Sequence, residues 1–215
     1  MPATMKIDFV SDVSCPWCII GLQALEQAIE RLGDTVHVDL HFQPFELNPA
    51  MPAEGQDVIE HLTQKYGGIA DDMQRNREAI RLRGAQLGFT FNMDKRSRVY
   101  NTFDAHRLLH WAQQEGHQLA LKHALFDAYF TDGLSPASHA VLLACARKVG
   151  LDGDRAAAIL GSTEFADEVR ASEKFYLEQG IHSVPAVIIN DQHLISGGQP
   201  VELFEKALRQ IAGAS

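Results

Sequence analysis

Cys15-Pro16-Trp17-Cys18 is the stretch that decides how this sequence is interpreted. It follows a short apolar run, Lys6–Val10, which predicts a strand. It opens an amphipathic segment that predicts a helix to about Leu32, with its proline in the first turn. A thiol at the start of a helix lies beside backbone N–H groups that have no helical partner, and these groups stabilise a thiolate. The thiolate is the nucleophile of disulfide exchange, so the pair predicts a redox centre in which Cys15 attacks and Cys18 resolves.

The rest of the chain predicts a sheet that is split by helices. Val36 to Phe42 alternates apolar and polar residues, so the chain begins strand–helix–strand with parallel strands. Residues 56–180 predict helices almost throughout. Val184–Ile189 and His193–Ser196 then predict two strands joined by a turn at Asn190-Asp191, before a last helix. Each β section is too short for a core of its own, so we expect one four-stranded sheet.

Composition and charge exclude several classes of protein. The chain has 215 residues, of which 46% are apolar and 22% charged, a balance typical of globular proteins. A net charge of −9 without a basic tail argues against nucleic acid as a partner. No apolar run is long enough to span a membrane, and Met1–Val10 contains no apolar segment typical of a secretory signal, so we expect a cytoplasmic protein. Three cysteines form no disulfide framework, which favours a reactive pair.

Five segments resemble the thioredoxin superfamily, specifically its DsbA-like branch and, within that branch, the cytoplasmic FrnE-like proteins. They follow one another as Asp12–Cys18 with Gly21, Phe42–Pro49, Asn101–Leu108, Ala124–Phe130 and Gly180–Pro185. The resemblance implies an α/β, thioredoxin-like fold with a large inserted all-helical domain. Residues 1–55 and 181–215 would form the discontinuous thioredoxin-like domain, and residues 56–180 the insertion. It also implies a thiol–disulfide oxidoreductase that acts on a protein, peptide or small-molecule disulfide.

The same resemblance implies roles for residues outside the cysteine pair. Pro185 would be a cis-proline that faces the cysteines and leaves the backbone of Val184 free to pair with an extended substrate. A proline that merely opens a strand is the alternative. Trp17 would tune the thiols and contact substrate, or would simply pack. A helical segment would face the cleft between the domains and contact substrate through Asn101, His106 and Arg107.

The residues around the pair also bear on proton transfer and metal binding. Asp12 precedes the pair and would accept the proton of the resolving thiol, or it is a turn residue. Zinc would need two ligands besides the pair, and the only other thiol, Cys145, lies in an apolar helical stretch that predicts burial. None of the ten histidines shows C-x-x-C…H-x-x-H spacing. His106 and His110 are four residues apart and could together hold a metal, but such a pair alone is much more often incidental, so we expect no metal.

Two other functions compete with the oxidoreductase. Glutathione-dependent isomerases and kappa-type glutathione transferases share the split architecture but use a serine at the first position of the pair, whereas this chain has Cys15. A non-catalytic, chaperone-like binding module would tolerate loss of that thiol. We expect no bound cofactor, while glutathione remains open as a co-substrate at the Val184-Pro185 step. The substrate, the net direction of exchange and the oligomeric state, including a homodimer, also remain open.

Overall fold

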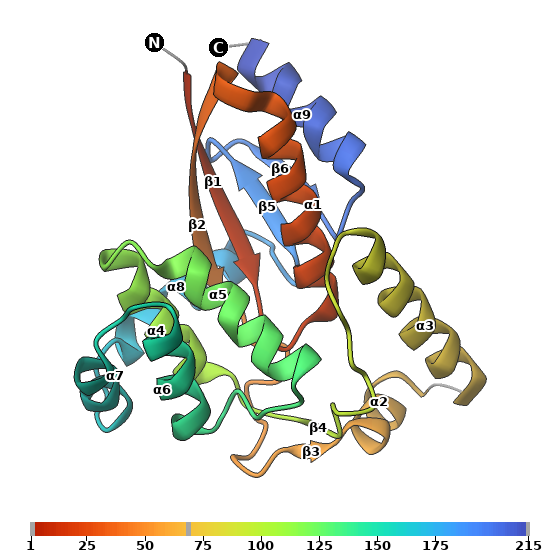
Figure 1. Ribbon diagram of the computed structural model, residues 1–215, viewed down its shortest axis with the longest axis vertical. Helices are drawn as coiled ribbons and strands as arrows, with labels where there is room; N and C mark the ends of the chain where they lie inside the picture. The colour runs from red at the N-terminus through yellow and green to blue at the C-terminus, as the bar shows by residue number, and fades with distance from the viewer. Residues whose placement is uncertain (1–2, 68–69, 214–215) are drawn as a thin grey trace.

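The computed structural model describes residues 3–67 and 70–213 and has the predicted α/β, thioredoxin-like architecture (Figure 1). Its main sheet has the strand order β2-β1-β5-β6, which confirms the expectation of one four-stranded sheet. β1 and β2 are parallel, and β5 and β6 continue the sheet in antiparallel pairs. The strands are β1 (Ala3–Ser11), β2 (Val36–Pro44), β5 (Ala186–Ile189) and β6 (His193–Ser196).

The first and last helices pack together in front of the sheet (Figure 1). α1 (Pro16–Leu32) has the bounds that the sequence predicts and ends in a 3₁₀ turn, η1 (Gly33–Thr35). α9 (Val201–Gly213) lies beside it. Apolar side chains such as Leu25 of α1 and Phe204 of α9 are fully buried in one core with the strands.

The Asn190-Asp191 turn sets the register of the late strands. Both residues have positive φ, 52° and 56°, as the predicted hairpin turn requires. The backbone N–H of Asn190 donates to the carbonyl of Lys6 at 2.9 Å, and its side-chain oxygen accepts from the N–H of Lys6 at 3.0 Å. Val10 therefore pairs with Ala186. This register brings Pro185 to the end of β1 from which the chain runs into the cysteine pair.

The helical block fills most of residues 56–180, as the sequence predicts. Within it, the pattern over Ile69–Leu87 predicts one helix; α3 (Ala70–Gln86) occupies this stretch, and Ile69 lies outside the described residues. The pattern over Asn101–Gln114 predicts another, but α4 (Phe103–Gln114) begins at Phe103, because the side-chain oxygen of Asn101 accepts from the N–H of Phe103 in a turn before the helix. A π-helical turn, η2 (Asp127–Thr131), follows α5. The helices are α2 (Val58–Tyr66), α3 (Ala70–Gln86), α4 (Phe103–Gln114), α5 (Gln118–Phe126), α6 (His139–Lys148), α7 (Gly153–Leu160) and α8 (Ala166–Glu178).

A second, two-stranded sheet was not predicted. It pairs β3 (Gln56–Asp57) with β4 (Arg98–Val99). Strands of two residues carry no alternation of apolar and polar positions, so periodicity does not reveal them.

Apolar side chains of the sheet region and of the helical block pack together in shared cores. The core of the sheet includes Ile80, Phe89 and Phe130 of the block, while the core of the block includes Val13, from the loop before the cysteines. The division into 1–55 with 181–215 and 56–180 stays a prediction. None of the described helices is both long and apolar enough to cross a membrane.

Candidate active site

The cysteine pair lies at the first turn of α1. Cys15 is the N-cap, with φ −95° and ψ 114°, and Pro16 follows in the first turn. No side chain caps the helix, so its first N–H groups remain directed toward the position of Cys15. Cys15 is 4% exposed and Cys18 is fully buried, and neither is in a disulfide.

Val184 and Pro185 lie against Cys15. The Sγ of Cys15 is 3.8 Å from the carbonyl oxygen of Val184. The Val184–Pro185 peptide bond is cis, the conformation that the resemblance implies. The carbonyl of Pro185 accepts from the N–H of Gly197 at 2.8 Å, which ties this step to the loop after β6. The structure thus brings the late β section to the thiol that we expect to be the nucleophile.

Two glycines allow α1 and the loops to approach closely. A Cβ at position 21 would lie 3.0 Å from Cγ of Pro185, and one at position 198 would lie 3.0 Å from the carbonyl oxygen of Trp17. Trp17 itself is half-buried. Arg83 of α3 donates to the carbonyl of Gly198 at 3.2 Å, so the helical block also holds this loop.

We expect Gly21→Ala to disturb the site through this packing. The added methyl group would push Pro185 away from α1, which lowers the free energy of unfolding by about 1–3 kcal/mol and slows disulfide exchange. Chemical denaturation and a disulfide-exchange assay measure the two effects. Gly213→Ala is the matched control, because a Cβ there meets no atom within 4 Å. Equal stability and exchange rates in both variants would contradict the prediction.

Asp12 is a buried carboxylate beneath the pair. Its oxygens accept from the backbone N–H of Leu47 at 2.8 Å and from the hydroxyl of Ser14 at 2.9 Å. The Nε2 of His106 is 3.6 Å from Oδ1, just beyond hydrogen-bond range. Burial tends to raise the pKa of Asp12, but His106 and the N–H donors of Leu47 and Ser14 outweigh it and lower the pKa. Asp12 is therefore an ionised group at neutral pH.

Lys122 is a buried ammonium group that the sequence analysis missed. It is 1% exposed, and its Nζ lies 5.6 Å from the ring centre of Phe42 and 5.1 Å from that of Phe126. Burial lowers its pKa to about 8, against the opposing charges of Cys18, Asp12 and Cys15. The sequence contained one sign of this burial. Lys122 lies within the apolar run Leu119–Phe126, and Phe126, four residues later, lies on the same helix face.

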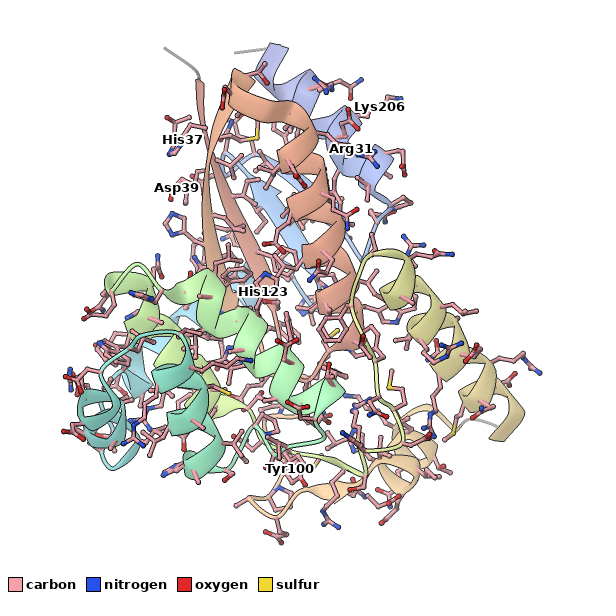
Figure 2. The ribbon with its side chains drawn as sticks, viewed as in Figure 1. Arg31, His37, Asp39, Tyr100, His123 and Lys206 are labelled. Carbon is pink, nitrogen blue, oxygen red and sulfur yellow. The ribbon has the colours of Figure 1, made fainter. Side chains whose placement is uncertain are left out.

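α5 is held in place beside the pair by a polar contact with α1. The labelled His123 of Figure 2 has its Nε2 3.0 Å from the carboxylate of Glu26. This contact anchors the helix that carries Lys122 to the helix that carries the cysteines.

Cys18 is held in its thiol form by its surroundings. Its pKa is raised well above the ordinary value, first by burial and then by the neighbouring Cys15, while the charge of Lys122 and the backbone of Asp12 act in the opposite direction. A thiol of this kind reacts only when another group helps to remove its proton.

Two of the three residues predicted to contact substrate, His106 and Arg107, are buried. His106 is 3% exposed and lies beneath Asp12 rather than at a surface. Arg107 is 3% exposed, and its guanidinium donates to the carbonyls of Ser162 and Glu164 at 2.7 and 2.8 Å and to Ile159. These positions speak against substrate contacts by His106 and Arg107, because helix α4 turns both side chains into the molecule.

Asn101 links the start of α4 to the loop after β2. Its side-chain nitrogen lies 3.2 Å from the carboxylate of Glu46 and 3.4 Å from the carbonyl of Pro49. Glu46 also pairs with Arg170 of α8. The half-buried amide is thus engaged in holding the loop that donates to Asp12.

Metal ligands do not gather in the described ranges 3–67 and 70–213. No group of three or more His, Cys, Asp or Glu side chains there is arranged to hold an ion. Cys145 is buried in α6, as predicted, and its Sγ lies 3.7 Å from the carbonyl of Ala124. The absence of zinc from the protein stays a prediction for elemental analysis.

Comparison with known proteins agrees with this geometry. Residues 6–209 match the sequence model of the DSBA-like thioredoxin domain. The chain is 30% identical over 208 residues to the uncharacterized protein YwbO of Bacillus subtilis (strain 168), covering 95% of this chain and 96% of YwbO.

Solved structures extend the comparison. The probable DsbA oxidoreductase SCO1869 of Streptomyces coelicolor superposes with a TM-score of 0.90 at 32% identity, covering 98% of this chain and 91% of that one. The cytosolic disulfide reductase DsbM of Pseudomonas aeruginosa, solved with GSH, has a TM-score of 0.65 at 18% identity and covers 96% and 98% of the two chains. At that identity the second likeness shows the fold alone.

Proposed function

We propose that this chain, which belongs to the DSBA-like thioredoxin domain family of oxidoreductases, exchanges disulfides through Cys15 and Cys18. The observation that carries the proposal is the position of Cys15. It is the N-cap of α1, and its sulfur faces the carbonyl of Val184 at 3.8 Å. A nucleophilic thiol and an extended backbone that can receive a substrate thus meet at one place.

Two transfers complete the proposed reaction. The thiolate of Cys15 attacks one sulfur of a substrate disulfide, forms a mixed disulfide and releases the other sulfur as a thiolate. Cys18 then loses its proton and attacks the Sγ of Cys15, which forms the Cys15–Cys18 disulfide and releases the second substrate thiolate. Two electrons pass from the cysteine pair to the substrate, and the reverse sequence oxidises a dithiol.

The buried charges support roles in the second transfer. The ammonium of Lys122 stabilises negative charge on Cys18, because its charge acts to lower the pKa of Cys18 while the charge of Cys18 acts to raise the pKa of Lys122. The ionised carboxylate of Asp12 is a weak base because its pKa is lowered, so it serves as a transient acceptor of the proton and not as its final site.

The substrate is proposed to lie along Val184 and Pro185, with the half-buried Trp17 at its side. A protein, peptide or small-molecule disulfide would fit this placement. Glutathione is a proposed co-substrate because DsbM, a protein of the same fold, was solved with GSH. The FrnE-like branch and a cytoplasmic location are part of the same proposal. They rest on the resemblance of the five sequence segments.

Equilibration with glutathione buffers of graded redox ratio tests the function. We expect Cys15 and Cys18 to lose their free thiols together in one two-electron transition, counted by alkylation and mass spectrometry. The measurement uses a Cys145→Ser background, so that only the pair is counted. A pair that stays reduced at every ratio would contradict the proposal. A stable glutathione adduct on Cys15 without closure to Cys18 would favour the glutathione-dependent isomerase or transferase instead.

A further inference from the structure

A small polar cavity lies behind the cysteine pair. Its volume is about 20 Å³, and its walls come from β2, α4 and α5. His106 and Lys122 form its inner wall, while His110 and Gln113 lie toward the surface. A cavity of this volume holds one water molecule when polar groups line it.

Two groups on the inner wall lack ordinary partners. The Nε2 of His106 is buried and has no hydrogen bond. No carboxylate of the described ranges lies within ion-pair distance of the amine of Lys122, and the rings of Phe42 and Phe126 lie 5.6 and 5.1 Å from it. Buried polar groups without a partner are costly and rare. The side chains of both residues line one cavity, which has room for a water molecule.

The inner wall of the cavity lies next to groups that surround the reacting thiol, and its outer end lies at the surface. A backbone hydrogen bond from Asp12 acts to lower the pKa of Cys18, and the carboxylate of Asp12 lies 3.6 Å from the Nε2 of His106. At the outer end, the side chain of Gln113 is exposed and lies 2.7 Å from Nδ1 of His41. Trp17, Val184 and Pro185 are not among the cavity walls.

We propose that a water molecule in this cavity, together with His106, conducts the proton of Cys18 to solvent by a route separate from the substrate groove. The proposal rests on the proposed disulfide exchange. When Cys18 attacks the mixed disulfide, its S–H bond breaks, the new S–S bond forms and the substrate leaves as a thiolate. The proton passes by Asp12 to His106, to the water and to solvent, and the leaving thiolate is protonated from solvent on its own side. In the reverse reaction a proton returns by the same route.

Other charged groups around His106 set the conditions of this route. Lys122 faces the cavity from α5, and His110 lies one turn along α4. Glu46, on the loop after β2, is close enough for His106 to affect its pKa, and it pairs with Arg170. Glu173 of α8 adds a second carboxylate beside that arginine.

Reaction with 5,5′-dithiobis(2-nitrobenzoate) separates the two transfers. Attack by Cys15 releases a first thionitrobenzoate, and closure by Cys18 releases a second. In the Cys145→Ser background, we expect His106→Gln to slow the second release about tenfold or more and to change its pH profile, while the first stays within about twofold. His139→Gln is the matched control, because that side chain pairs with Asp104 at an exposed position.

Rescue and isotope measurements exclude a merely structural effect. In His106→Ala, imidazole is expected to restore the second release, whereas pyrazole, of the same size but far less basic, is not. If these variants fail to fold, the unsubstituted protein in D₂O still tests the route, with an expected slowing of about twofold in the second release only. Equal rescue by pyrazole, an unchanged second release in His106→Gln or no isotope effect would overturn the route. A protein that never gives two releases would instead overturn the proposed function.

Discussion

Cys15→Ser is expected to abolish disulfide exchange, with a rate lower by at least about 1,000-fold, because a serine hydroxyl is not ionised at neutral pH and cannot replace the attacking thiolate. Cys18→Ser is expected to accumulate a mixed disulfide instead of losing all reactivity. The first transfer proceeds, but the mixed disulfide on Cys15 persists because the resolving thiol is missing. Mass spectrometry after reaction with oxidised glutathione would show one glutathione attached to Cys18→Ser and none to Cys15→Ser.

Cys145→Ser provides the control for both variants. Its thiol is buried in α6 and lies 3.7 Å from the carbonyl of Ala124, in a core separate from that of the pair. We expect its exchange rate to remain within about twofold of the unsubstituted protein, since it takes no part in the transfers. Near-normal exchange by Cys15→Ser, or trapping on Cys18 rather than Cys15, would reverse or remove the assigned roles.

Lys122→Met is expected to raise stability at neutral pH while it slows the second transfer. The pKa of Lys122 falls from 10.5 to about 8 in the folded protein. At pH 7 the amine is charged in both states, so the folded state bears the cost of burying the charge. Each pKa unit corresponds to about 1.4 kcal/mol, so methionine raises the free energy of unfolding by about 3 kcal/mol.

The cost of burying the Lys122 charge depends on pH. Between about pH 8 and 10.5 the folded chain releases the proton of Lys122 while the unfolded chain keeps it, so the unsubstituted protein gains stability as pH rises. This gain should disappear in Lys122→Met. Denaturation at pH 7 and pH 10 measures it, with Lys148→Met as the control, because Lys148 is largely exposed. A destabilised Lys122→Met protein that keeps a normal second transfer would contradict both expectations.

The local parts of the fold were predictable from the sequence. Pro16 marks the start of α1, and the observed helix ends at Leu32, as the apolar stripe indicates. The Asn190-Asp191 turn and its two strands were also predictable, because the residues that tolerate positive φ stand at the turn itself. These features depend on residues that are neighbours in the chain, so they can be predicted from a single sequence.

The family resemblance predicted that Val184 and Pro185 lie beside Cys15. The local sequence patterns alone did not predict this contact. Pairing of β5 with β1, fixed in part by the contacts between Asn190 and Lys6, brings the two segments together. Periodicity predicts strands but not which strands become neighbours. The resemblance therefore contributed the long-range contact, and the structure gives its hydrogen bonds.

The sequence by itself determined the strand–helix–strand start, the cysteine pair at a helix N-terminus and the late hairpin. Only the tertiary structure decided that Lys122 and His106 lie beneath the pair and that Arg107 braces the helical block. A polar residue in an amphipathic helix has the same local pattern whether it meets solvent or a buried thiol. The difference arises when α4 and α5 pack against β2, because burial then changes the energy of each charge and decides its partners.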